Sequence, residues 1–409
     1  MKVSVICSSF HPAVRNGGIT ESDRRMCEEL ARQGVSISVV TSNADGFGTL
    51  PGQYDGWSRA ESYRVYYGRR WFWRDLSPGM AGEIFREVAL GDVIHVSGTF
   101  NWFLPLAAWS ASRWARPLVV SPHGSLLPAA LNRRAVAKEW FSVMFQRPAL
   151  RRVAAFCATS RPEGEALRRL FPASRVEVIP AGVDVPVTLP LREGAARPYL
   201  LFLGRLHPFK RVERIIRAFA CAGGGRVADR PGRKNAVTTA SVNAAWCLLI
   251  AGEGERGYRE TLEETAAECG VGNRVRFLGN VAGEDKTRLL AQAEGLVLAS
   301  YSENFGMSVV ESLAHGTPCV VANTAPWERL DREGCGFCVD DSEEALADGI
   351  GRLMMLEPGE RHAMGMKGRE WMKQEFSWSG AAEKIVSLYA SVIDQYHDEQ
   401  GSGRSAVRS

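Results

Sequence analysis

Short apolar runs, separated by polar segments with helical periodicity, recur along the whole chain. Such runs are typical of buried strands, and strands that alternate with helices form parallel sheets. In the first half of the chain the runs fall at residues 3–8, 36–41, 93–96, 118–121, 156–159 and 176–179. In the second half they fall at residues 199–203, 246–251, 275–278, 295–299, 318–322 and 334–339. This pattern predicts an α/β fold made of two doubly wound, Rossmann-like domains.

The segment 184–197 separates the two series of strands. It contains prolines, mixed charge and little periodicity, as linkers between domains do. A chain of 409 residues also exceeds what one ordinary core supports. We therefore predict an N-terminal domain over residues 1–183, a linker over 184–197 and a C-terminal domain over 198–376. An amphipathic helix follows at about 380–397, and the small, polar residues 398–409 predict a disordered tail.

Three segments are less regular than the rest. Thr20 is predicted to cap the helix that follows the first strand. Residues 45–75 are rich in Gly, Tyr and Trp but poorly periodic, so we predict loop and short strand there. Residues 222–244 are more than a helix-to-strand connection needs, which indicates a surface insertion without an assigned role.

Composition points to a cytoplasmic protein. No run approaches the roughly 18 apolar residues of a spanning helix, and the chain starts directly with a strand rather than a signal-peptide pattern. The nine cysteines lack regular spacing, which suits reduced thiols. Cys335 and Cys338 form the one close pair, but a zinc site would want a second pair and a redox motif would open a helix. We interpret this pair as structural.

Positive charge is concentrated in one part of the chain. Residues 101–190 carry 12 Lys or Arg against 5 Asp or Glu, whereas the whole chain has a net charge of +4. Within that part, residues 131–152 combine arginines with bulky apolar side chains at helical spacing. One interpretation is an interfacial helix that contacts an anionic membrane. The other is an ordinary helix that docks its aromatic residues on the core and leaves its arginines in solvent.

Two glutamates flank a predicted strand-to-helix turn. Glu303 lies on the loop after the strand 295–299, and Glu311 lies two turns into the following helix. Asn304, Phe305, Gly306 and Met307 lie between them, where the helix starts. Because the first amides of a helix have no internal partner and the dipole favours an anion there, a phosphorylated ligand suits this turn. The residues suggest a sugar nucleotide, with its diphosphate on the amides and its hydroxyls on the carboxylates.

A second turn supplies two cations. The strand 199–203 ends at Gly204, and Arg205 and Lys210 follow on either side of a His-Pro turn before a helix starts near Val212. Two cations at a strand end beside a helix start favour a diphosphate. The first strand of the chain likewise leads into a loop with Gly17 and Gly18, a geometry that lets a backbone approach an anion closely.

The sequence around His123 gives another candidate contact. His123 and the glycine after it directly follow the strand 118–121. Ligands of doubly wound sheets bind outside the carboxyl ends of the strands, so His123 is placed for contact with one.

Taken together, these motifs resemble the retaining glycosyltransferases of family 4, which have the GT-B fold. The resemblance spans nearly the whole chain. It implies that Gly17 and Gly18 face the donor diphosphate, that His123 contacts the donor sugar, and that the last helix packs back onto the first domain. It also implies that Gly204, Arg205 and Lys210 hold the diphosphate, that Glu303 orients the sugar, and that Glu311 binds the ribose. The turns with Glu253 and Val281 would border the nucleobase.

The resemblance further implies the reaction. A sugar would move from a UDP- or GDP-sugar to a hydroxyl of a glycan or lipid-linked acceptor, with retention of configuration and without a metal or cofactor. The departing phosphate oxygen would take the acceptor proton. Such a reaction would serve polysaccharide or glycolipid biosynthesis, at the inner face of the membrane if residues 131–152 dock there.

Two rival enzyme classes are considered. A sugar-nucleotide 2-epimerase shares the GT-B fold but needs no acceptor. A dinucleotide-dependent dehydrogenase would require a Gly-x-Gly-x-x-Gly loop after a strand, with an acidic residue about 20 positions on, and neither half of the chain has it. The chain also lacks the aromatic pattern of a known RNA-binding module, so nucleic acid is not an expected partner.

Overall fold

The computed structural model describes residues 1–13, 18–46, 48–71, 76–131, 142–190, 197–222, 245–254 and 257–406. The chain divides into two compact units. The N-terminal unit comprises Met1–Gly182 together with Trp378–Ser409, and the C-terminal unit comprises Val183–Ser377. Each unit is a sheet of parallel strands covered by helices, so the predicted pair of Rossmann-like α/β domains is confirmed.

The N-terminal unit has an eight-stranded sheet in the order β10-β9-β8-β7-β1-β2-β6-β5. Its pairings are parallel except for β5 with β6. The strands are β1 (Lys2–Ile6), β2 (Ser36–Ser42), β5 (Gly56–Arg59), β6 (Arg64–Gly68), β7 (Val93–Ser97), β8 (Leu118–Ser121), β9 (Ala155–Ala158) and β10 (Arg175–Val178). From β1, the chain builds toward β2 on one side and later toward β7 on the other. The sheet order therefore reverses between β1 and β7, and ligands of such sheets bind beside that point.

Both faces of this sheet are buried. Val3 and Val5 of β1 pack with the apolar stripes of α1 (Gly18–Arg32) and α15 (Trp378–Ala406). Ile6 points to the other face, toward α2 (Pro78–Leu90) and α3 (Phe103–Arg113). Full burial explains why these strands are continuously apolar rather than alternating. Within the described ranges, the remaining helices of this unit are η2 (Gly52–Tyr54), α4 (Pro128–Leu131), the π-helix η3 (Ser142–Gln146), α6 (Arg147–Leu150) and α7 (Arg161–Leu170).

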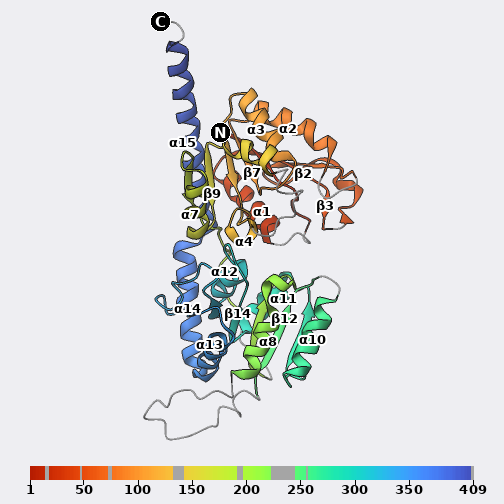
Figure 1. Cartoon of the computed structure of the whole chain (residues 1–409), viewed down its shortest axis with the longest axis vertical. Helices are drawn as coiled ribbons and strands as arrows, with labels where there is room; N and C mark the ends of the chain where they lie inside the picture. The colour runs from red at the N-terminus through yellow and green to blue at the C-terminus, as the bar shows by residue number, and fades with distance from the viewer. Residues whose placement is uncertain are drawn as a thin grey trace. The chain divides into compact units, whose positions relative to one another are not determined.

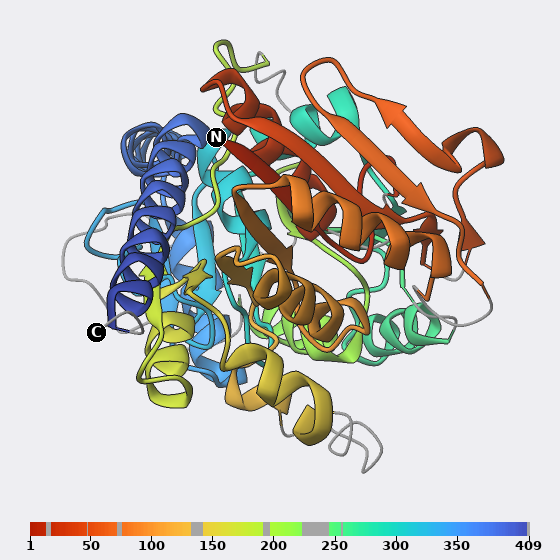
Figure 2. The ribbon, with the colours of Figure 1, turned by 90° about the horizontal axis from the view of Figure 1, so that it is seen from above.

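The last helix belongs to the N-terminal unit. Figure 1 and Figure 2 both show α15 alongside α7 and β9. Its Tyr389 is fully buried, and the phenol is hydrogen-bonded to Nδ1 of His95 on β7. The structure corrects the predicted end of the chain, because α15 continues through Ala406 where a disordered tail from residue 398 was expected. Helix extension adds one hydrogen bond per residue, and no proline interrupts it.

One further prediction for this unit is wrong. Thr20 is not a helix cap, because α1 already begins at Gly18 and Thr20 lies on the buried face of the helix. The short strand predicted within residues 45–75 is present, because β5 and β6 form an antiparallel hairpin that extends the sheet. A small separate hairpin, β3 (Ala44–Asp45) with β4 (Gly48–Thr49), precedes them.

The C-terminal unit has a six-stranded, wholly parallel sheet in the order β13-β12-β11-β14-β15-β16. The strands are β11 (Tyr199–Leu203), β12 (Cys247–Ala251), β13 (Val275–Gly279), β14 (Gly295–Leu298), β15 (Cys319–Ala322) and β16 (Gly336–Val339). The helices among the described residues of this unit are η4 (Pro208–Lys210), α8 (Val212–Cys221), α10 (Tyr258–Glu268), α11 (Gly283–Gln292), α12 (Met307–Ala314), α13 (Glu343–Met355) and α14 (Pro358–Glu375). In this sheet the order reverses between β11 and β14.

Residues 184–190 and 197, the described part of the predicted linker, belong to the C-terminal unit. Arg369 of α14 is 5% exposed and holds this segment. It donates to the carbonyl oxygens of Pro186 and Val187, and also to that of Ala314 at the end of α12. The predicted insertion at 222–244 lies outside the described residues from 223 onward. Across the described ranges, no helix is both long enough and apolar enough to span a bilayer.

Candidate active site

The reversal point of the C-terminal sheet brings the two strongest sequence motifs together. Lys210 follows β11 and Glu303 follows β14, and these strands are hydrogen-bonded neighbours. The turn after β11 is tied to the loop after β14, because the Tyr301 amide donates to the Phe209 carbonyl at 2.8 Å. Residues 93 positions apart in sequence therefore share one edge of the sheet.

Lys210 and Glu303 form an ion pair at this edge. The distance from Lys210 Nζ to Glu303 Oε2 is 2.5 Å, and the side chains are 26% and 16% exposed. Ser300 also donates to Glu303 Oε2, at 3.0 Å. Partial burial and a second donor fix the carboxylate, so the ammonium is held at a defined position with part of its surface open to solvent.

The start of α12 is shaped by a glycine in the left-handed region. Gly306 has φ +83°, and a Cβ built there would lie 3.3 Å from both Glu303 Cγ and Trp327 Nε1. Trp327 Nε1 donates to the Phe305 carbonyl at 2.6 Å, which anchors the loop. Met307 is the first residue of α12, directly after the predicted helix start near Gly306. Asn304 and Met307 are half-buried and Phe305 is buried.

Glu311 is also paired. Its Oε1 lies 2.7 Å from Nζ of Lys286, a residue of α11 that the sequence reasoning did not select. The two side chains are 22% and 32% exposed, Glu311 being the more buried. Each of the two predicted carboxylates thus has its own lysine partner, one from the turn after β11 and one from α11.

The turns after β11 and β12 are in direct backbone contact. The Leu206 amide donates to the Glu253 carbonyl at 2.8 Å, and a Cβ on Gly252 would lie 1.9 Å from the Gly204 carbonyl oxygen. Only glycine fits at position 252, where φ is +146°. The Gly252 amide in turn donates to the Gly279 carbonyl at 2.7 Å, two residues before the half-buried Val281. Gly204, Glu253 and Val281 therefore lie along one connected edge.

Arg205 differs from the other candidates in its surroundings. Its side chain is exposed, and within the described part of the chain no hydrogen bond or ion pair joins it to Glu303 or Glu311. It follows Gly204 directly at the end of β11, on the edge that carries Lys210.

The remaining predicted residues belong to the N-terminal unit. His123 follows β8 with a positive φ of 52°, a conformation that a non-glycine residue rarely adopts and that clusters at functional sites. Its Nε2 lies 2.9 Å from Ser97 Oγ. Gly18 is the exposed first residue of α1. Gly17 lies outside the described residues.

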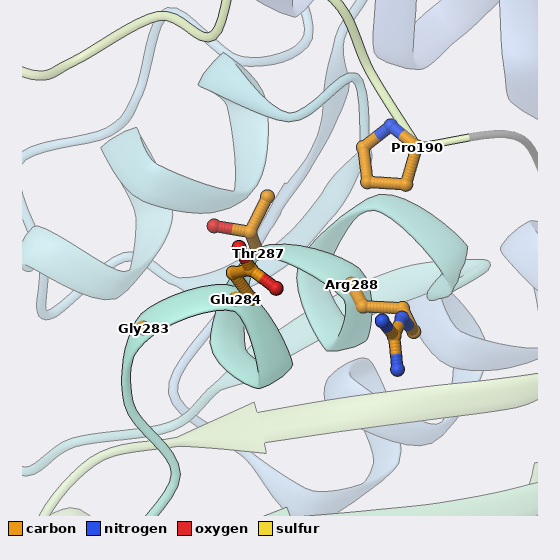
Figure 3. A pocket seen from close by; sticks show the side chains of 5 residues that line it. All are labelled: Pro190, Gly283, Glu284, Thr287 and Arg288. Carbon is orange, nitrogen blue, oxygen red and sulfur yellow. The ribbon is translucent and has the colours of Figure 1, made fainter.

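A hollow of about 510 Å³ lies beside α11. Figure 3 shows Glu284, Thr287 and Arg288 on the first turns of this helix, with Pro190 across from them. None of the sequence-predicted site residues lines it. It does not coincide with the edge that carries Lys210 and Glu303.

The described part of the basic segment, residues 142–152, has an exposed apolar stretch. Val143, Met144 and Phe145 are 44%, 59% and 53% exposed. Arg147, Arg151 and Arg152, which follow at helical spacing, are exposed as well. The prediction that the aromatic residues dock on the core does not hold for Phe145.

Two family models match the chain, one in each unit. A model described as glycosyl transferase 4-like domain matches residues 17–182, and a model described as glycosyl transferases group 1 matches residues 191–371. Together they cover most of the chain, and their boundary falls where the two structural units divide.

Similar proteins point the same way. The chain is 27% identical over 339 residues to D-inositol 3-phosphate glycosyltransferase of Nocardia farcinica, covering 76% of this chain and 70% of the relative. It is 26% identical over 419 residues to GDP-mannose:cellobiosyl-diphosphopolyprenol alpha-mannosyltransferase of Xanthomonas oryzae, covering all of both chains. Among solved structures, Anabaena HepE in complex with UDP and glucose superposes with a TM-score of 0.71 at 21% identity, covering 96% of this chain and 100% of that one. The chain belongs to the GT-B glycosyltransferases of the family 4 type.

Proposed function

We propose that the protein is a retaining glycosyltransferase that moves a sugar from a nucleoside-diphosphate sugar to an acceptor hydroxyl. The observation that carries this proposal is the Lys210–Glu303 ion pair, 2.5 Å long, at the reversal point of the C-terminal sheet and beside the start of α12. An ammonium group and free helix amides at one edge suit a diphosphate, and a carboxylate beside them suits sugar hydroxyls.

The mechanism follows from where charge develops. As the sugar leaves, negative charge grows on the diphosphate, and Lys210, Arg205 and the first amides of α12 stabilise it. The anomeric carbon becomes cation-like. The acceptor hydroxyl attacks from the face that the diphosphate leaves, and the departing phosphate oxygen takes its proton. The new bond forms on the face of the old one, so configuration is retained.

The two carboxylates have separate tasks in this scheme. Glu303 holds Lys210 in position. Lys210 and Ser300 both donate to Oε2, so the carboxylate has further lone pairs that can accept a hydrogen bond from a donor-sugar hydroxyl. Glu311, steadied by Lys286, accepts hydrogen bonds from the ribose. No step in this scheme requires a metal ion or another cofactor.

The donor is a UDP- or GDP-sugar. The full-length Xanthomonas relative is named for GDP-mannose, and the HepE structure contains UDP. The printed names of the relatives also suggest the acceptor class, since one acts on a diphosphopolyprenol-linked disaccharide and another on an inositol phosphate. We favour a lipid-linked glycan or glycolipid, because relatives that match over their full length are named for a diphosphopolyprenol-linked acceptor.

The exposed segment 142–152 supports binding of the protein to the inner membrane surface. Val143, Met144 and Phe145 offer apolar surface, and the neighbouring arginines offer charge to anionic lipids. The protein should sediment with phosphatidylglycerol-containing vesicles at low salt, and Met144→Ser combined with Phe145→Ser should reduce the bound fraction. If the protein and the variant sediment equally, or neither does, this segment is not a membrane contact.

The transfer assay combines UDP-, GDP- and ADP-sugars with lipid-linked and inositol-phosphate acceptors, and NMR reads the anomeric configuration of the product. Glu303→Gln and Lys210→Ala should each lower transfer roughly 100-fold. Lys373→Ala is the matched control, because Lys373 pairs with Glu370 on the exposed surface of α14. Near wild-type transfer by both site variants would end the proposal, and an isomerised sugar from donor alone would indicate the epimerase instead.

A further inference from the structure

Three polar side chains from three elements meet at the reversal point of the N-terminal sheet. Asp23 comes from α1, Ser97 ends β7, and His123 follows β8. Ser97 Oγ lies 2.7 Å from Asp23 Oδ2 and 2.9 Å from His123 Nε2. The other carboxylate oxygen, Asp23 Oδ1, lies 3.8 Å from His123 Nε2. The three groups form one connected chain from carboxylate to hydroxyl to imidazole.

The proton directions in this chain are determined by chemistry. A serine hydroxyl has one proton, and Ser97 donates it to the carboxylate of Asp23. Ser97 Oγ can then only accept from the ring of His123, so Nε2 must carry a proton. In the neutral imidazole the other nitrogen, Nδ1, is consequently a hydrogen-bond acceptor.

The burial of Asp23 indicates that the role of this arrangement is to orient His123 and not to stabilise the fold. Asp23 is 1% exposed, and its Oδ1 has no hydrogen-bond partner within the described residues. Burial raises the pKa of the Asp23 carboxyl, while the nearby imidazole of His123 and the hydrogen bond from Ser97 oppose that shift. A buried carboxylate with one unpaired oxygen is costly, and an apolar side chain would pack there at less expense.

The backbone that carries His123 is fixed independently. Glu163 of α7, itself 1% exposed, accepts from the Gly124 amide at 2.5 Å through Oε1. Its other oxygen accepts from the Thr159 amide at 2.8 Å. One buried carboxylate thus holds the turn after β8, and a second one, Asp23, reaches the imidazole through Ser97.

We propose that Asp23 and Ser97 are positioning residues that hold His123 as the Nε2-protonated tautomer, which leaves Nδ1 to accept a hydrogen bond from a hydroxyl of the donor sugar. The inference rests on the proposed function and on the contact between His123 and the donor sugar that the family resemblance implies. It assigns to one residue of α1 and one of β7 a part in orienting His123.

The test combines kinetics with direct observation of the ring. Asp23→Asn and Ser97→Ala should each lower kcat/KM for transfer roughly tenfold in the wild-type background, and by less than about twofold when combined with His123→Ala, because both act through the same side chain. Ser97→Thr retains the hydroxyl and should preserve transfer. Ser110→Ala is the control, since Ser110 is a fully buried serine whose hydroxyl has no partner among the described residues.

Imidazole 15N NMR of His123 provides a readout independent of turnover. The wild type should show the Nε2-protonated tautomer, and Ser97→Ala should show a mixture of tautomers. An unchanged tautomer in Ser97→Ala would overturn this inference and leave the proposed function standing. So would double variants whose loss in kcat/KM is the full sum of the Asp23 or Ser97 effect and the His123→Ala effect. Full transfer by His123→Ala would also remove His123 from the proposed mechanism. If no donor supports transfer, the proposed function fails, and the NMR comparison still decides whether Ser97 sets the tautomer.

Discussion

Replacing Gly306 with alanine separates the cost of backbone strain from damage to the site. Gly306 has φ +83°, and an alanine in the left-handed region costs about 1–2 kcal/mol. The added Cβ would also lie 3.3 Å from Glu303 Cγ and from Trp327 Nε1, close enough that one neighbour must move by a few tenths of an ångström. Trp327 is 3% exposed and packed among aromatic rings, so Glu303 is the side chain that moves.

A matched control exists in the same unit. Gly270, just after α10, has φ +67° and nothing within 4 Å of an added Cβ. Gly270→Ala therefore carries the strain without the contact. For a unit of this size each kcal/mol lowers the melting temperature by about 2–4 °C. We expect both variants to melt about 2–8 °C below the wild type and to differ little from each other.

Their activities should differ clearly. Displacing Glu303 lengthens its 2.5 Å contact with Lys210, so Gly306→Ala should lose roughly tenfold or more in kcat/KM for transfer. Gly270→Ala should transfer like the wild type. Initial rates of transfer and thermal unfolding followed by circular dichroism measure the two effects separately. Equal activities of the two variants would refute the link between Gly306, Glu303 and Lys210.

Three other changes have defined outcomes. Lys286→Ala leaves Glu311 without its partner and should weaken nucleotide binding roughly threefold in calorimetry with little change in kcat; unchanged affinity would contradict this. Burial lowers the pKa of His95 to about 3, so only the unfolded chain binds this proton between about pH 6.5 and 3. The free energy of unfolding should therefore decrease as the pH is lowered through that window, by about 3 kcal/mol at pH 4.5. Denaturant titrations of His95→Gln should show a weaker dependence of this free energy on pH. Arg369→Met leaves the Ala314 carbonyl unpaired and should cost about 2–3 kcal/mol in the same assay, and a loss below about 0.5 kcal/mol would contradict the role given to this buried arginine.

Local patterns in the sequence were enough to predict the fold and most turns of the site. An apolar run, a polar loop and a helical period around Glu303 predict the turn that the structure shows, because strand, loop and helix are neighbours in sequence. The same holds for Gly204 and Lys210. The 2.5 Å contact between Lys210 and Glu303 was not predicted, because it depends on β11 lying beside β14, and strand order is a property of the whole sheet.

The sequence around Asp23 contained a signal of its burial. This residue stands beside two arginines on α1 and resembles a solvated charge, yet Thr20, Asp23, Cys27 and Leu30 follow the spacing of one buried helix face. A carboxylate on that stripe was a signal of a buried polar contact. Lys286 carried no such signal, because its partner Glu311 belongs to another helix. Short strand was predicted in the segment of β5 and β6, but their pairing was not, because glycines and tyrosines obscure the alternation.

The central claim is that Lys210, held by Glu303, binds the diphosphate of a sugar donor. Calorimetric titration of the wild type and of Lys210→Ala with UDP, GDP and ADP tests it most directly. We predict that one of the three nucleotides binds the wild type and that Lys210→Ala weakens its affinity at least roughly tenfold, whereas Lys373→Ala binds it unchanged. Equal affinity of Lys210→Ala and wild type, or no binding of any of the three, would contradict the account.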